Sequence, residues 1–504
     1  MPPIYKRKGF DTDKYLKVQT KAIKERVKKF KGKLYLEFGG KLSYDLHASR
    51  VLPGYDPTAK IQLLKNLKDI ELIYCVSAKD IQKGRVRRDF GLTYDNQTLK
   101  DIADFKFFGL KVLAVVISLY EGESLAKRLK EKLEQRGIKT YFFKKIPGYP
   151  NNIERVVSKD GYGIQPYIQT KKPIIIVTGT GPGSGKMSFC LSQMYHDHQK
   201  GISSGFAKFE TFPIWNLPLN HPVNIAYEAA TADLKDINIV DPFHKKAYGI
   251  TAINYNRDIE NFAIMKKMIS RIVGNNIYAA KYQSPTDMGV NTAKAGIIDD
   301  LAVRAAARQE IIRRYFRYYE ERIEGIEKQS TVDWMKKIMA KAKVKITDRP
   351  TVVAAQKRVK EIKKKNRGLL GICCAAAIEL ADGKIITGKN SLLLHAESAT
   401  ILNALKFLAR IPDEIDLLSS QVIQNIIYLK KDFFGSASGA LNIEETLIGL
   451  AISAATNPMA EKALTMLAEL KNSELHSTYL PSQTNKNTLI KLQINYTTDA
   501  ELIL

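Results

Sequence analysis

The sequence predicts an α/β protein whose N-terminal part forms a doubly wound, mostly parallel sheet. Strand-like runs alternate with helix-length segments, and a glycine-rich segment joins one β-branched run to a helical pattern. Strands that alternate with helices favour a parallel sheet, and unbroken apolar runs are typical of strands covered on both faces. The 504 residues are enough for about three domains.

The expected elements follow one another in a regular order. A first amphipathic helix is expected over residues 13–30. Strands are expected at 34–38, 72–77, 112–119, 140–143 and 174–178. Helices are expected between them at 58–67, 97–108 and 124–136. Because ligands of such sheets bind at the carboxyl ends of the strands, the loops that follow these strands are candidate sites.

The segment PIIIVTGTGPGSGKMS, from Pro173 to Ser188, has the composition of a phosphate-binding loop. Its glycines allow close backbone approach, and the free N–H groups of the helix that begins at Lys186 would attract an anion. The lysine would add a positive charge. We therefore expect phosphate contacts from this loop, at Gly181, Gly183, Ser184, Gly185, Lys186 and Ser188.

This segment departs from the standard pattern G-x-x-x-x-G-K-[ST] in two places. Thr180 stands where the first glycine belongs, and Met187 stands where the hydroxyl that binds Mg²⁺ belongs. The dinucleotide pattern G-x-G-x-x-G also fails, because Ser184 takes its last glycine position. The sequence thus favours a phosphate site of non-standard geometry over an ordinary ATPase, and a tight turn without a ligand is the alternative.

The loop after the first strand is a second candidate. Gly39, Gly40 and Lys41 follow that strand and are expected to contact a substrate. A plain Gly-Gly turn beside a surface helix is the equally weighted alternative.

Residues 205–289 are rich in Asn, Asp, Pro and aromatic residues, and we interpret them as site or interface loops between short helices. Asp241 ends an apolar run, as the Mg²⁺-binding carboxylate of a phosphate-loop protein does. A cap on the helix that starts at Pro242 is the favoured alternative. His244 is a candidate acid or base, because an ordinary histidine has a pKa near 6.5.

A polar cluster lies further along the same segment. Asn254 and Asn256 are candidate substrate contacts. Arg257 could grip a phosphate with two hydrogen bonds, or pair with Asp258 or Glu260 as structure. Asp241, His244 and Arg257 are the candidate catalytic residues, with Mg²⁺ and a nucleotide as candidate cofactors.

A helical region follows. Helices are expected over 300–327, 332–344 and 352–365. The domains are then expected at residues 1–290, 291–366 and 367–504. The last domain is expected to contain a hairpin that turns at Asp382-Gly383, helices at 396–408, 444–455 and 459–470, and strands at 474–479 and 489–497.

That order of hairpin, helix and strands resembles the cytidine-deaminase fold. His395-Ala396-Glu397 matches the H-x-E element of zinc deaminases, but the helix that starts at Pro458 has no P-C-x-x-C. One histidine cannot hold zinc alone. We therefore expect no zinc and a surface or interface position for His395. Zinc-free members of this fold include a dimeric transformylase domain of purine biosynthesis, so the resemblance allows a nucleotide or folate ligand.

The net charge of +27 indicates acidic partners. The lysines are spread over helix faces and no nucleic-acid-binding module is visible, so binding to nucleic acid is not expected. Apolar runs are too short for a membrane span, and no signal peptide is apparent. The four cysteines lack CxxC spacing and are expected to be reduced, in a cytoplasmic protein.

Several long motifs, among them YLEFGGKLSYDLHASRVLPGY and TGPGSGKMSFCLSQMYHDHQKG, resemble a large family of cytoplasmic bacterial proteins whose domain has no known function. The resemblance covers nearly the whole chain and implies no activity. From the residues we expect a homo-oligomer that binds a nucleotide or another phosphorylated small molecule, as a transferase or hydrolase. A non-catalytic binding or scaffold protein is the alternative.

Overall fold

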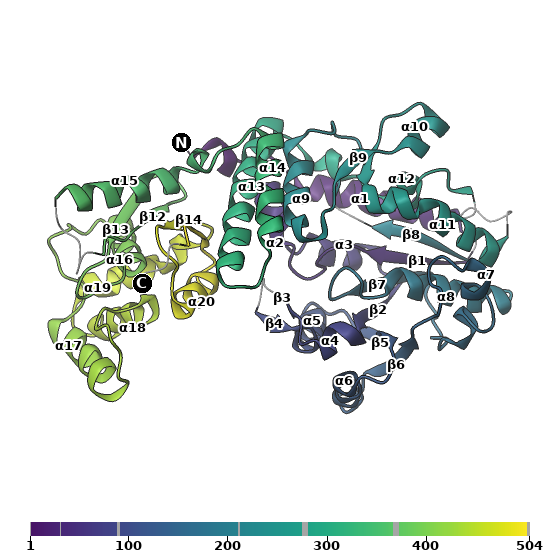
Figure 1. The fold of residues 1–504 in the computed structure, drawn as a ribbon, viewed down its shortest axis with the longest axis horizontal. Coiled ribbons are helices and arrows are strands. Elements are labelled where there is room, and N and C mark those ends of the chain that lie inside the picture. Colours follow the sequence, from purple (N-terminus) through teal and green to yellow (C-terminus); the bar gives the residue numbers. More distant parts are fainter. Residues whose placement is uncertain are drawn as a thin grey trace. The chain divides into compact units, whose positions relative to one another are not determined.

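The computed structural model describes residues 2–30, 32–87, 91–209, 212–274, 281–365 and 372–500. The chain forms two compact units (Figure 1). The first, here called the α/β unit, comprises Lys8–Glu228 and Asp236–Val303. The second, here called the C-terminal unit, comprises Met1–Arg7, Ala229–Lys235 and Arg304–Leu504.

The α/β unit is built on a seven-stranded sheet in which every hydrogen-bonded pair is parallel. The strand order is β11-β8-β1-β7-β2-β5-β6. The strands are β1 (Lys33–Phe38), β2 (Ile70–Ser77), β5 (Val112–Tyr120), β6 (Lys139–Lys144), β7 (Ile174–Gly179), β8 (Ser204–Phe209) and β11 (Gly289–Val290). The prediction of a mostly parallel α/β sheet is confirmed, and each of the five expected strands is present.

The helices of this unit also match the apolar periodicity of the sequence. They include α1 (Thr12–Lys28), α3 (Ala59–Leu67), α5 (Tyr94–Phe107), α6 (Ser124–Glu134) and α8 (Lys186–Gln199). Strand β7 is buried along its whole length, as its unbroken β-branched run predicts. The sheet therefore places the glycine-rich loop, which follows β7, at its centre.

The direction in which the chain winds reverses at β1 and β7. From β1 the chain passes β7 to reach β2, whereas from β7 it passes β1 to reach β8 on the other side. The loops that follow these two neighbouring strands therefore leave the sheet in opposite directions. In open α/β sheets ligands bind in the crevice that such a reversal creates.

The interpretation of residues 205–289 as loops between short helices is wrong in part. This segment contains β8, the helix α9 (Pro222–Ala230), a two-stranded antiparallel sheet of β9 (Asn238–Val240) and β10 (Ile253–Tyr255), and the 18-residue helix α11 (Asn256–Val273). Helix α11 buries Phe262, Met265, Ile269 and Ile272 at helical spacing. The polar residues at its start hid that periodicity.

The C-terminal unit holds a four-stranded mixed sheet in the order β13-β12-β14-β15. Strand β12 (Ala375–Glu379) is antiparallel to β13 (Ile385–Lys389) and to β14 (Glu474–Ser477), and β15 (Asn495–Thr498) is parallel to β14. Its helices include α14 (Gln329–Ala342), α15 (Pro350–Lys364), α16 (Ala396–Ala409), α18 (Ile443–Ser453) and α19 (Pro458–Thr465). The helix α13 (Asp300–Ile323) begins in the α/β unit and continues here.

The prediction of a strand at 489–497 is wrong for most of its length. Residues 483–491 form the helix α20 (Gln483–Lys491), and only Asn495–Thr498 pair as a strand. The helix starts with a Ser482 cap and buries Leu489 on its inner face. None of the helices within the described ranges carries an apolar stretch long enough to cross a membrane.

Candidate functional site

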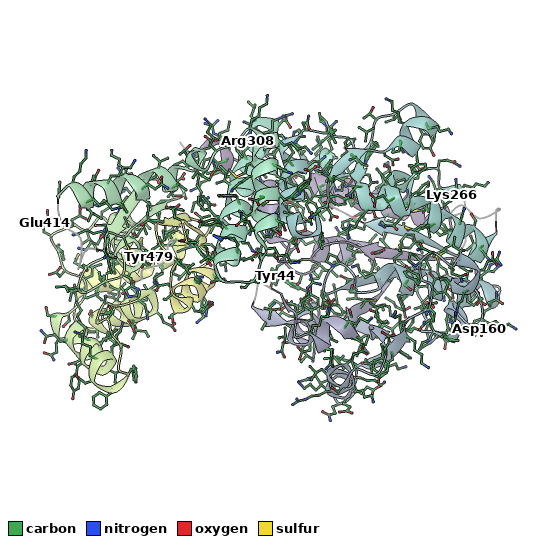
Figure 2. The ribbon with its side chains drawn as sticks, in the orientation of Figure 1. Tyr44, Asp160, Lys266, Arg308, Glu414 and Tyr479 are labelled. Carbon is green, nitrogen blue, oxygen red and sulfur yellow. The ribbon has the colours of Figure 1, made fainter. Side chains whose placement is uncertain are left out.

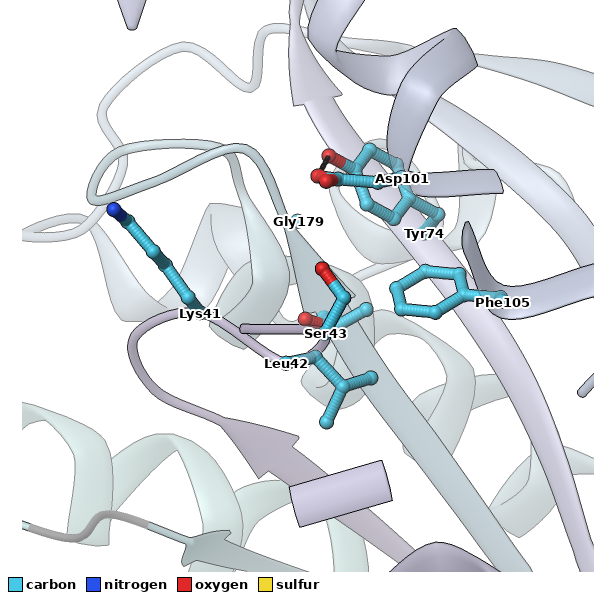
Figure 3. Close-up of a pocket in the computed structure, with 8 residues that line it drawn as sticks. Lys41, Leu42, Ser43, Tyr74, Asp101, Phe105 and Gly179 are labelled. Atoms are coloured by element: carbon cyan, nitrogen blue, oxygen red, sulfur yellow. Dashed lines mark hydrogen bonds between the residues drawn. The ribbon is translucent and has the colours of Figure 1, made fainter. Parts of the chain in front are cut away.

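The loop after β1 and the carboxyl end of β7 line one small cavity at the edge of the sheet, just before the glycine-rich loop begins (Figure 3). Its lining residues are Lys41, Leu42 and Ser43 from the first loop, Thr178 and Gly179 from β7, Tyr74 from β2, and Asp101 and Phe105 from α5. The cavity has a volume of about 10 Å³, which is close to the space that one water molecule needs. Two segments far apart in the sequence thus meet at the winding reversal.

The wall of this cavity is rigid on the side of α5. The Tyr74 hydroxyl donates to one carboxylate oxygen of Asp101 at 2.6 Å, and the Gln97 amide donates to the other at 2.6 Å. Figure 3 shows the tyrosine hydroxyl against this carboxylate, while Lys41 extends away from both. Asp101 is therefore an acceptor that fixes the wall.

The glycine-rich loop takes a left-handed conformation at two positions that only glycine adopts readily. Gly183 has φ of +76° and Gly185 has φ of +83°. A Cβ atom on Gly185 would lie 2.6 Å from the Cβ atom of Ser118. The Ser118 hydroxyl also donates to the carbonyl oxygen of Ser184 at 2.9 Å. Strand β5 thus supports the loop from below.

Lys186 is the first residue of α8, and its amino group turns back onto the loop. It donates to the carbonyl oxygen of Gly181 at 3.1 Å and to the hydroxyl of Ser184 at 3.4 Å. The buried hydroxyl of Thr180 has no hydrogen-bond partner in the described part of the chain. Ser188, two residues further along α8, partly offsets the rise that burial causes in the pKa of Tyr149 and of Tyr162. The loop therefore gathers a cation and hydrogen-bonding groups at a helix N-terminus, an arrangement that suits an anion.

The Gly39-Gly40 turn is anchored by a buried ion pair. The Lys60 ammonium lies 2.9 Å from a carboxylate oxygen of Asp45 and donates to the carbonyl oxygen of Gly39 at 3.2 Å. Burial alone would raise the pKa of Asp45, but Lys60 outweighs it and lowers that pKa. Gly40 has φ of +67°. Lys60 therefore holds the turn in place, and Lys41 follows the turn and lines the cavity.

Asp241 is a helix cap, as the favoured alternative stated. Its Oδ1 atom accepts from the backbone N–H groups of Phe243 and His244 at 3.0 Å, at the start of α10 (Pro242–Tyr248). Its Oδ2 atom accepts from the Thr286 hydroxyl at 2.7 Å, in α12 (Pro285–Met288). The carboxylate is fully buried by these contacts, which join it to α10 and α12 and not to the glycine-rich loop.

The His244 imidazole also belongs to this cluster. Its Nδ1 atom lies 2.9 Å from the Ser284 hydroxyl and 3.7 Å from the Asp287 carboxylate. Asn254 donates to the Thr286 hydroxyl at 3.4 Å. The structure thus brings His244 and Asn254 together around α12.

The other two residues of the polar cluster hold β9 and α11 together. Arg257 forms a two-point ion pair with the buried Asp236, with both nitrogen–oxygen distances at 2.8 Å. The Asn256 side chain accepts from the backbone N–H of Ile237 at 3.0 Å. The predicted pairing of Arg257 with a carboxylate is therefore present, with Asp236 in place of Asp258 or Glu260.

Glu37 is an acidic residue near the end of β1, the strand that pairs with β7, and it precedes the Gly39-Gly40 turn predicted to contact a substrate. It is in register with Val177 of β7 and Lys208 of β8. Tyr35, two residues earlier, donates to Asp197 of α8 at 2.8 Å. Side chains two residues apart in a strand share a face, so Glu37 lies on the face that α8 covers.

Two buried thiols report that Glu37 and Lys186 share this region. Burial raises the pKa of Cys75 to about 12, with Lys186 lowering it and Glu37 raising it. The same two charges act in the same senses on the pKa of Cys190, which burial also raises. The glutamate is the one charged residue in the apolar strand KLYLEFGG after its first position, and this signal could have identified it.

The H-x-E element lies in the C-terminal unit, and its glutamate is fully buried. Glu397 accepts from the hydroxyls of Ser477 at 2.8 Å and Tyr479 at 2.5 Å, the latter labelled in Figure 2. Burial raises the pKa of Glu397. His395, expected at the surface or at an interface, is half-buried at the start of α16, and burial lowers its pKa. Within the described ranges, no three His, Cys, Asp or Glu side chains are grouped as metal ligands.

Comparison with known proteins gives a consistent result along the chain. A family model described as "Domain of unknown function DUF1846, N-terminal" matches residues 8–343, and its C-terminal counterpart matches residues 347–503. A UPF0371 protein of Clostridium tetani is 49% identical over 495 residues, covering 98% of this chain and 97% of that protein. A UPF0371 protein of Clostridium botulinum (strain ATCC 19397 / Type A) is 48% identical over 499 residues, covering 99% and 98%. The chain therefore belongs to the DUF1846 family, that of the UPF0371 proteins.

Proposed function

We propose that the crevice between the loops after β1 and β7 binds a phosphorylated small molecule, such as a nucleotide. The observation that carries the proposal is Lys186, whose amino group reaches back to the carbonyl oxygen of Gly181 across the loop. A phosphate oxygen would compete for this amino group, because charge-assisted hydrogen bonds are roughly twice as strong as neutral ones.

The surrounding geometry supports an anionic ligand. The loop follows the central strand at the winding reversal, and the first N–H groups of α8 would face the same ligand as Lys186. Lys41 adds a second lysine from the neighbouring loop at the shared cavity. That cavity fits about one oxygen atom, so the rest of the ligand would lie along the rim of the two loops.

The proposal gives no chemical step to the three candidate catalytic residues. Asp241 is fully used as a cap, His244 is bonded to Ser284, and Arg257 is paired with Asp236. Without an assigned base or nucleophile, a transferase or hydrolase activity rests only on the ligand class. A non-catalytic binding protein is the second candidate, and Met187 in place of the Mg²⁺-binding hydroxyl favours it.

For the C-terminal unit we propose a fold class, and for the whole protein an assembly of identical chains. A zinc-free cytidine-deaminase-like fold is supported by the order of hairpin, helix and strands. A homo-oligomer is supported by large apolar side chains that are mostly exposed, among them Leu392, Phe433 and Phe434. Light scattering coupled to size exclusion would refute the oligomer if the protein elutes as a monomer at all concentrations.

Isothermal titration with nucleotides, sugar phosphates and pyrophosphate tests the site. Lys186→Ala should weaken binding roughly 10- to 100-fold, since a hydrogen bond to a charged group contributes about 1.5–3 kcal/mol. Lys127→Ala is the matched control, because Lys127 is an exposed lysine of α6 in the same unit. Wild-type affinity of Lys186→Ala for each ligand would refute the proposal.

A further inference from the structure

Glu37 carries a buried oxygen that the fold does not satisfy. Its Oε2 atom has almost no contact with solvent and no hydrogen-bond partner in the described part of the chain. An unsatisfied carboxylate oxygen in a protein interior is costly, and native structures place few of them without a reason. The position next to the glycine-rich loop suggests what that reason is.

The lysines around Glu37 are engaged with other partners. Lys208 is its neighbour in register on β8, but the Lys208 ammonium pairs with Asp258 of α11 at 2.6 Å. Lys186, whose charge acts on the same two thiols as that of Glu37, donates to Gly181. Both ammonium groups thus bind other groups, and within the described residues the Oε2 atom of Glu37 is left for another cation.

A phosphate on the loop would lie close to this carboxylate. Strand β1 pairs directly with β7, and Glu37 is in register with Val177, two residues before Gly179. Helix α8, which starts at the loop, buries Cys190, and the charge of Glu37 raises the pKa of this thiol. Two anions at such close quarters repel each other unless a cation lies between them.

We infer that Glu37 holds a divalent cation, Mg²⁺ in the cell, against the phosphate that the glycine-rich loop binds. The inference rests on the proposed function and names the metal partner of that site. Magnesium keeps most of its waters and is commonly bound through one or two carboxylates plus substrate phosphates, so one glutamate is a sufficient protein ligand. Glu37 thereby replaces the hydroxyl that the sequence lacks at Met187.

Pyrophosphate titrations with MgCl₂ and with EDTA test this inference. For the wild type, Mg²⁺ should tighten pyrophosphate binding about tenfold. For Glu37→Gln, this gain should disappear while the affinity measured in EDTA does not fall, because the change keeps the shape and removes a charge that repels the phosphate when no cation is present. In MgCl₂, pyrophosphate binds Mg²⁺ in solution to the same extent whichever protein is titrated. The difference in affinity between the wild type and Glu37→Gln therefore reports the carboxylate alone.

Matched controls separate the outcomes. Glu131→Gln, at an exposed glutamate of α6, should keep the full gain from Mg²⁺. Glu37→Gln should melt no lower than the wild type, since the Oε2 atom that it replaces has no hydrogen-bond partner within the described residues. Mn²⁺ paramagnetic resonance should show the ion lost from this variant. A Mg²⁺ gain that persists in Glu37→Gln, or equal weakening of this variant in both buffers, would overturn the inference. Absence of pyrophosphate binding by the wild type would overturn the proposed function as well, whereas binding without any Mg²⁺ gain would overturn the inference alone.

Discussion

Two glycines of the same loop should respond very differently to alanine. Both Gly183 and Gly185 have left-handed backbones, where an alanine costs about 1–2 kcal/mol. A Cβ atom on Gly183 meets nothing within 4 Å, whereas on Gly185 it lies 2.6 Å from the Cβ atom of Ser118. Such overpacking adds about 1–3 kcal/mol. Gly183→Ala should therefore destabilise the α/β unit by about 1–2 kcal/mol, and Gly185→Ala by about 2–5 kcal/mol.

Urea unfolding of the full chain, followed by a signal from the α/β unit, measures this difference in stability. The chain has two tryptophans, Trp215 in the α/β unit and Trp334 in the C-terminal unit. In a Trp334→Phe background the fluorescence of Trp215 reports only the α/β unit, which avoids merging two unfolding transitions. The entropy that alanine removes from the unfolded chain is the same for both variants. Equal losses for the two variants would refute the close approach of the loop to β5.

Three further substitutions test assignments made above. Asp241→Ala should lower stability by about 1–2 kcal/mol through loss of a cap, without changing pyrophosphate affinity; a lost affinity in titration would contradict the cap assignment. Arg257→Ala removes the ion pair with the buried Asp236 and, because the arginine side chain is 47% exposed, should destabilise by about 1–3 kcal/mol in urea; a variant as stable as the wild type would contradict it. Burial raises the pKa of Glu474, but Arg349 helps to lower it below the ordinary value of 4.5. The ionised carboxylate therefore stabilises the fold above pH 4.5, and this contribution is lost as the pH falls through the lowered pKa of the folded state. Glu474→Gln should make the free energy of unfolding depend less on pH in acid, and an unchanged pH profile would contradict this.

The sequence predicted the elements of the sheet better than their neighbours in space. The run from Ile174 to Val177 favoured a buried strand, because all four of its residues are β-branched. Helix α11 was missed because its polar start resembles a loop, although its buried face from Phe262 to Ile272 has helical spacing. In the C-terminal unit, the apolar residues near Leu489 fit a strand as well as the inner face of α20, and short apolar runs do not distinguish the two.

The candidate site depended on strand order, which local pattern does not contain. The loop at Gly39 and the loop at Gly183 were each predicted from glycines at a strand end, yet nothing in the sequence says that β1 pairs with β7. That pairing brings the loop after β1 to a cavity at the carboxyl end of β7, the strand that the glycine-rich loop follows. The pair of candidates thus became one site only through a contact between strands that are distant in the chain.

Strand order also separates Asp241, which caps α10, from the glycine-rich loop. Asp241 follows the loop in the chain order of a phosphate-loop protein, but β9 pairs with β10 in a separate two-stranded sheet. Glu37 precedes the loop in sequence, yet its strand is the immediate neighbour of β7. A metal-binding carboxylate must be near the phosphate in space, and strand adjacency supplies that proximity whatever the chain order. The Mg²⁺ titration of pyrophosphate binding can compare Asp241→Asn with Glu37→Gln. Asp241→Asn should keep the gain in affinity from Mg²⁺, and Glu37→Gln should lose it.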